Sequence, residues 1–106
     1  MVASTKQETL ARGLQRLFEV SRPELIRRLS IVEEAVNARN DGVISDDLRE
    51  QAHFEAHKLA GVLGTFGKKD ASRSAYRLEM MFEGNEQLET TDTHEHIHII
   101  RGALQE

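Results

Sequence analysis

The sequence predicts an all-α protein, namely an antiparallel up-down four-helix bundle with an additional N-terminal helix. Apolar residues recur at steps of three and four along most of the chain, and no segment alternates as a β-strand does. There is one proline in 106 residues. The connections between long helical segments are short, which favours antiparallel neighbours. This length suits one core, so we expect residues 1–106 to form a single domain.

Two helices are predicted before the first glycine turn. The first spans residues 5–20, and its inward stripe is formed by Leu10, Leu14 and Leu17. Ser21 and Glu24 then form a capping-box pattern, with Pro23 early in the following turn, where its missing N–H is tolerated. A second helix therefore starts here and runs to about Asn40, where Asp41 and Gly42 supply the stop.

The central helix begins at Ser45, a good N-cap, and places Asp46 and Asp47 at the positive end of the helix dipole. Gly67 is expected to end it in a left-handed conformation. Its core stripe consists of Leu48, Ala52, Ala56, Leu59, Leu63 and Phe66.

Two further helices follow a short connection. The first carries its stripe on Ala71, Ala75, Leu78 and Phe82 and closes at Gly84. The last is expected to begin at about residues 91–93 and to direct Ile97, Ile100 and Leu104 inward.

His57 is predicted to face solvent from the central helix. It lies roughly 160° from Leu59 on a helical wheel, and Gly61 and Gly64 lie roughly 140–160° from Leu59. Glycine inside a helix costs about 0.5–1 kcal/mol relative to alanine, so two glycines on this face suggest that another surface approaches the histidine closely. Phe54 lies about 140° from the core face, and it either contacts a partner or packs under the first helix.

These residues also carry a family resemblance. His57-x-Leu59-x-Gly61, followed by Gly64, Gly67 and Leu78-Glu79, resembles the signature of histidine-containing phosphotransfer (HPt) domains. The resemblance implies an antiparallel four-helix bundle and a role in phosphorelay signal transduction. His57 would accept a phosphoryl group from a receiver-domain aspartate, or from a kinase, and pass it to another receiver aspartate.

The same resemblance implies the chemistry and the partners. Nε2 of His57 would attack the acyl phosphate, and the receiver would supply Mg²⁺, so no cofactor of the chain's own is expected. The partners would be a response-regulator receiver domain and a sensor histidine kinase. On the helical wheel, the residues expected to surround His57 and dock the partner are Glu50, His53, Phe54, Gly61 and Gly64.

Two positions depart from the family pattern. Many members carry lysine three residues after the histidine and a small hydroxyl residue soon afterwards, whereas this chain has Ala60 and Val62. Lys58 and Lys68 are the candidates to place positive charge beside the phosphate instead. The departures leave open an alternative, a non-catalytic HPt-like module that binds partner proteins.

Composition excludes several other functions. The net charge of −4 argues against nucleic acid as the main partner, and there is no nucleotide-binding motif, so we expect a phosphotransfer intermediate and not a kinase. Without cysteine there is no disulfide framework. His94 and His98 have the spacing of a metal-binding pair, but no third ligand is evident, and no metal site is expected.

The chain is expected to act in the cytoplasm. No apolar run approaches the ~20 residues needed to cross a bilayer, and the first residues lack the apolar region of a signal peptide. We therefore expect no membrane association. The chain is either a whole protein or a domain of a larger sensor kinase, and a self-contained bundle favours a monomer.

Overall fold

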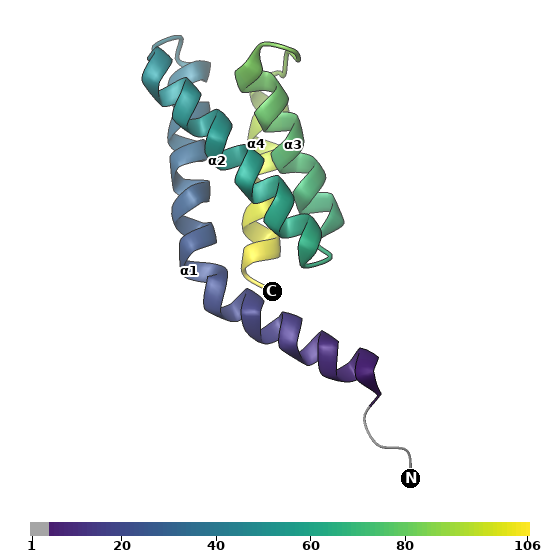
Figure 1. Cartoon of the computed structure of the whole chain (residues 1–106). Helices are drawn as coiled ribbons and strands as arrows, with labels where there is room; N and C mark the ends of the chain where they lie inside the picture. The colour runs from purple at the N-terminus through teal and green to yellow at the C-terminus, as the bar shows by residue number, and fades with distance from the viewer. Residues whose placement is uncertain (1–4) are drawn as a thin grey trace.

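The computed structural model describes residues 5–106 and, within that range, contains four helices and no strand. They are α1 (Lys6–Asn40), α2 (Asp46–Thr65), α3 (Lys69–Glu83) and α4 (Thr90–Leu104). Successive helices run in opposite directions (Figure 1). Each packs against the next, and α4 packs back against α1, so the four helices close a ring around one core. The predicted all-α bundle is confirmed.

The predicted break at Ser21–Glu24 is wrong, because α1 is one helix of 35 residues that passes through Pro23. A proline inside a helix loses one backbone hydrogen bond and crowds the carbonyl one turn earlier, which bends the helix without necessarily ending it. Figure 1 shows α1 changing direction partway along its length. The additional N-terminal helix is therefore the first half of α1. Its N-cap is Thr5, whose hydroxyl accepts a hydrogen bond from the backbone N–H of Glu8 at 3.1 Å.

The apolar stripe predicted to face inward from this first half is exposed. Leu10, Leu14 and Leu17 are 66%, 41% and 56% exposed. The reason is that this half of α1 extends past the end of the bundle, where no other helix covers it (Figure 1). Phe18 is the buried residue of this half, and its ring packs edge to face on Phe66 with the centroids 5.3 Å apart.

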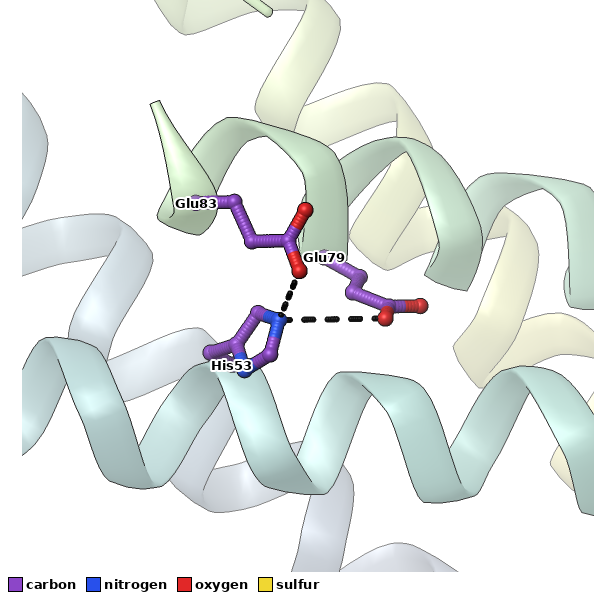
Figure 2. A group of neighbouring side chains, drawn as sticks. All are labelled: His53, Glu79 and Glu83. Atoms are coloured by element: carbon purple, nitrogen blue, oxygen red, sulfur yellow. Dashed lines mark hydrogen bonds and ion pairs between the residues drawn. The ribbon is translucent and has the colours of Figure 1, made fainter. Parts of the chain in front are cut away.

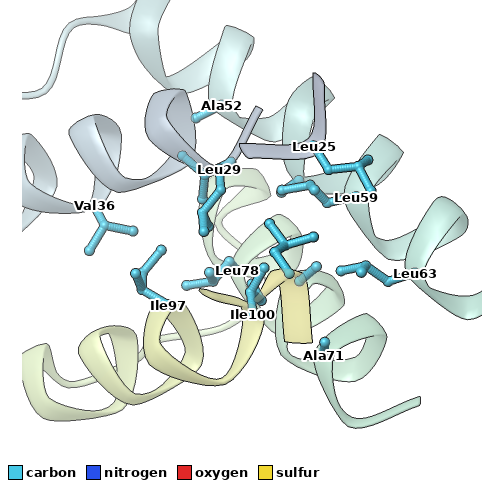
Figure 3. Packing of buried hydrophobic residues seen from close by; sticks show 14 of the residues in the cluster. Leu25, Leu29, Val36, Ala52, Leu59, Leu63, Ala71, Leu78, Ile97 and Ile100 are labelled. Atoms are coloured by element: carbon cyan, nitrogen blue, oxygen red, sulfur yellow. The ribbon is translucent and has the colours of Figure 1, made fainter. Parts of the chain in front are cut away.

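The other predicted stripes do form the core, part of which Figure 3 shows. On α2, Leu48 and Phe66 lie partly buried at the two ends of the stripe, and the four residues between them are fully buried. The buried stripe residues of α2, α3 and α4 are Ala52, Ala56, Leu59, Leu63, Ala71, Ala75, Leu78, Phe82, Ile97, Ile100 and Leu104.

The turns follow the predicted chemistry with one correction. The Ser45 hydroxyl accepts a hydrogen bond from the backbone N–H of Leu48 at 3.1 Å, and Gly67 ends α2 with a φ of 77°. The last helix starts at Thr90, slightly earlier than expected, because Glu89 is its N-cap. Thr93 is instead fully buried, and its hydroxyl accepts a hydrogen bond from the Asn40 side chain at 3.1 Å.

A buried ion pair ties α1 to α2. The carboxylate of Glu55 is 5% exposed and pairs with the guanidinium of Arg28, with Arg27 at 3.8 Å. This pair therefore links α1 to the helix that carries His57. None of the helices within residues 5–106 is long and apolar enough to cross a membrane.

Candidate functional site

His57 projects from the middle of α2, and its side chain is 69% exposed. Nδ1 of the ring lies 2.8 Å from Oε2 of Glu79 on α3, whose side chain is only 10% exposed. A carboxylate oxygen only accepts hydrogen bonds, so Nδ1 carries a proton and its N–H donates a hydrogen bond to Glu79. In the neutral form of the ring, the other nitrogen, Nε2, then keeps its lone pair. The pairing therefore sets both the tautomer and the orientation of an exposed imidazole.

Beside the ring lies a shallow hollow of about 600 Å³ between α2 and α3. Two cationic side chains, Lys69 and Arg73, line it, together with the half-exposed ring of Tyr76. The remaining lining residues are His57, Ala60, Gly61, Gly64, Ser72 and Glu79. A hollow that combines an imidazole with two cations can accept an anionic group.

Sequence reasoning missed Lys69, Ser72, Arg73 and Tyr76. A signal was available, because counting back from Glu79 in steps of three and four gives Tyr76, Ser72 and Lys69, with Arg73 three residues before Tyr76. These residues therefore share one face of α3. Which helix this face meets depends on the tertiary structure, and the face lies along the groove beside His57.

The two glycines next to His57 have different surroundings. A Cβ on Gly64 would lie 3.2 Å from Oγ of Ser72, so the close approach here comes from α3 of the same chain. A Cβ on Gly61 would meet no atom within 4 Å. Gly61 alone leaves an open, lowered ridge next to the imidazole, as the sequence suggested for both.

Comparison with known proteins identifies the family of the chain. The family model for the Hpt domain matches residues 13–106, which is most of the chain. The chain belongs to the Hpt domain family. Hpt domains serve phosphorelays by histidine phosphotransfer, interact with receiver domains and kinases, and are phosphotransfer modules rather than kinases.

A curated relative of this Hpt domain is protein RcaC of Microchaete diplosiphon, 27% identical over 89 residues. The match covers 84% of this chain but only 14% of that protein. The chain thus spans about a seventh of the length of this relative. No solved structure matches this chain significantly.

The two lysines predicted to neighbour the phosphate lie outside the hollow of this Hpt domain. The ammonium of Lys58 sits 5.0 Å from the centre of the Phe54 ring, in a cation–π contact. Nζ of Lys68 lies 2.6 Å from Oε2 of Glu106 and 4.9 Å from the centre of the Phe18 ring. In this arrangement Lys69 and Arg73 line the hollow, and the other two lysines have partners elsewhere.

The predicted docking residues divide into free and engaged side chains. Glu50 is exposed and Phe54 is 55% exposed, so the alternative in which Phe54 packs under the first helix is wrong. His53 is only half-exposed, and its Nε2 lies 2.7 Å from Oε1 of Glu83 on α3. The predicted docking residues that are exposed are therefore Glu50, Phe54, Gly61 and Gly64, and Gly64 has Ser72 of α3 beside it.

Proposed function

We propose that His57 is the phosphoacceptor of this Hpt domain, taking a phosphoryl group from a receiver aspartate or a kinase and passing it to another receiver aspartate. The observation that carries the proposal is the pairing of Nδ1 with Glu79 at 2.8 Å on a ring that is 69% exposed. A buried carboxylate holds one nitrogen, and the ring as a whole remains accessible. Nε2 is therefore the nucleophile.

The transfer step follows from this tautomer. The lone pair of Nε2 attacks the phosphorus of the aspartyl phosphate, the bond between phosphorus and the aspartate oxygen breaks, and the aspartate leaves as a carboxylate. Because Nδ1 keeps its proton, the phosphorylated ring carries a positive charge. Glu79 lies next to Nδ1 and stabilises that charge in the product. Onward transfer reverses these steps.

Positive charge for the phosphoryl oxygens would come from the hollow. Lys69 and Arg73 line it, and within residues 5–106 Arg73 has one weak ion pair, to Asp70 at 4.0 Å, with its side chain 75% exposed. Arg73 is thus free to turn towards a phosphoryl group on His57. These two cations replace the positive charge that the lysine three residues after the histidine supplies in many family members. Mg²⁺ would come from the receiver domain, so the chain would need no cofactor of its own.

The receiver would dock on the open side of α2. Gly61 leaves room for loops beside the imidazole, and Phe54 offers an exposed aromatic ring, a residue type common at interface hot spots. Lys58 holds that ring through its cation–π contact, so the contact surface is preformed.

The test is phosphate transfer from a phosphorylated receiver domain in the presence of Mg²⁺. The chain should acquire an acid-labile, base-stable phosphate, and His57→Gln should abolish it while the helical circular dichroism signal is unchanged. His98→Gln, which changes an exposed histidine on α4, is the matched control and should be labelled normally. Labelling of the folded His57→Gln variant would contradict the proposal. Receiver binding that is independent of His57, without any labelling, would favour a non-catalytic binding module.

A further inference from the structure

A second histidine of α2 faces the same buried carboxylate. Nε2 of His53 lies 2.7 Å from Oε1 of Glu83 and 3.8 Å from Oε2 of Glu79 (Figure 2). One ligand atom from each of the three residues lies within 4.8 Å of the others. Glu79 and Glu83 stand one turn apart on α3, opposite His53 on α2, so two packed helices hold the group together.

Among residues 5–106, no lysine or arginine balances the charge of this group. In the described part of the chain, the ion-pair partners of Glu79 and Glu83 are histidines, with no lysine or arginine among them. The other buried glutamate, Glu55, is different, because Arg28 and Arg27 both pair with it. Glu79 is almost buried, and a carboxylate in that position favours a nearby cation.

We propose that His53, Glu79 and Glu83 bind a divalent transition-metal ion of the Zn²⁺ class. An imidazole nitrogen and two carboxylate oxygens are ligands that Zn²⁺ accepts, with water in the fourth position. Ligand atoms about 2.0–2.1 Å from a tetrahedral metal lie about 3.3 Å from one another. The distances from His53 Nε2 to the two carboxylates, 2.7 and 3.8 Å, lie on either side of that value. Small side-chain rotations would therefore complete the site. Imidazole favours Zn²⁺, Cu²⁺ or Ni²⁺ over Mg²⁺.

The site would regulate phosphotransfer, a consequence that rests on the proposed function of His57. Oε2 of Glu79 is the atom that accepts the hydrogen bond from Nδ1 of His57, and it is also the nearer carboxylate oxygen of Glu79 to His53. A metal ion on Glu79 withdraws negative charge from that oxygen. Its support for the positively charged phosphorylated ring then weakens, so metal binding slows transfer.

Binding is tested first, with Zn²⁺ by calorimetry and with Co²⁺ by its visible absorption spectrum. The chain should bind one equivalent, and His53→Gln and Glu83→Gln should each weaken binding by about tenfold or more. The matched control is the double variant His94→Gln/His98→Gln, which removes the exposed pair on α4 and should bind normally. Unchanged binding in His53→Gln, loss of binding in the α4 variant, or no binding at micromolar metal would overturn the site.

Regulation is tested by transfer from a phosphorylated receiver in Mg²⁺, with and without Zn²⁺. Zn²⁺ should slow transfer severalfold to the unmodified chain but not to Glu83→Gln, a comparison that corrects for any effect of Zn²⁺ on the receiver. Equal slowing in both proteins would overturn the regulatory role. A metal-free chain that accepts no phosphate would contradict the proposed function of His57, whereas the metal site is decided by the binding experiment alone.

Discussion

The side chain of Ser72 on α3 packs directly against Gly64 on α2. Its hydroxyl donates a hydrogen bond to the carbonyl of Ala60 at 2.6 Å and stands 3.2 Å from the position that a Cβ on Gly64 would take. The hydrogen bond holds the hydroxyl in place, so it cannot easily yield to a methyl group. Gly64 is therefore required by packing between two helices, while Gly61, with open space around it, is not.

Alanine substitutions should separate these two glycines. Gly61→Ala should raise the free energy of unfolding by about 0.5–1 kcal/mol, because alanine is the better helix former. Gly64→Ala should lower it by about 1 kcal/mol, because the crowding of Ser72 outweighs that gain. Urea denaturation measures both, and the penalty of Gly64→Ala should shrink in a Ser72→Ala background. Equal stabilisation by both alanines would refute the packing argument.

Removing the charge of Glu79 should slow phosphotransfer. Glu79→Gln keeps the shape of the side chain but loses the carboxylate that fixes the tautomer of His57 and stabilises the charged product. We expect the transfer rate to fall by about tenfold or more, as for other orienting partners of functional histidines. The rate is measured by rapid quench with a phosphorylated receiver and Mg²⁺. Glu83→Gln in metal-free buffer is the control and should transfer normally, so a similar loss there would point to a general structural effect.

The residues that line the hollow indicate which cationic side chains assist phosphotransfer. Arg73→Ala and Lys69→Ala should each slow transfer severalfold, because both side chains line the hollow beside His57. Lys68→Ala should have little effect, since Lys68 is paired with Glu106. The same transfer assay compares the three variants. A larger loss of transfer rate in Lys68→Ala than in the other two variants would instead support the prediction from sequence that Lys68 lies beside the phosphate.

Arg28, which forms the buried ion pair with Glu55, should contribute more to stability than the more exposed Arg27. Arg28→Ala leaves the carboxylate of Glu55 buried, with Arg27 at 3.8 Å as its remaining ion-pair partner among residues 5–106, and should lower the free energy of unfolding by about 3 kcal/mol. Arg27→Ala should cost less than about 1 kcal/mol, because that guanidinium is 54% exposed. Chemical denaturation of the two variants makes the comparison. Equal losses would show that the buried pair between Arg28 and Glu55 stabilises the fold no more than the contacts of Arg27 do.

His96 should make stability depend on pH. Burial lowers the pKa of His96 below its usual value of 6.5, Arg77 lowers it further, and Asp92, Glu95 and Glu86 oppose the shift. Its Nδ1 lies 2.9 Å from the hydroxyl of Ser74. In the window below pH 6.5 the unfolded chain binds the proton more readily, so the contribution of His96 to stability is full above that pH and is lost as the pH falls.

The measurement is the urea midpoint at pH 7.5 and 5.5 for the unmodified chain and His96→Gln. The variant should lose less stability on acidification than the unmodified chain. The difference in this loss between the two proteins separates the effect of His96 from the effects of the other histidines. A parallel decline of both would show that His96 does not contribute.

The sequence and the structure agree best where a local rule governs the outcome. The Ser45 cap, the left-handed Gly67 and the buried stripes of α2 to α4 all follow from side-chain chemistry and periodicity within a few turns. Prediction failed at Pro23 because a capping-box pattern there is compatible with both a helix start and a bent, continuous helix. It failed at Leu10, Leu14 and Leu17 because periodicity shows that a stripe is apolar, but not that another helix covers it.

The sequence by itself determined helices α2 to α4, the exposed face of His57 and the family, because each of these depends on residues close together in the chain or on a motif. Only the tertiary structure decided which side chains meet across the groove between α2 and α3. It paired Glu79 with His57, turned Lys69 and Arg73 towards the hollow, and joined His53 to Glu83. These contacts join residues in different helices, and their register is set by the packing of the whole core.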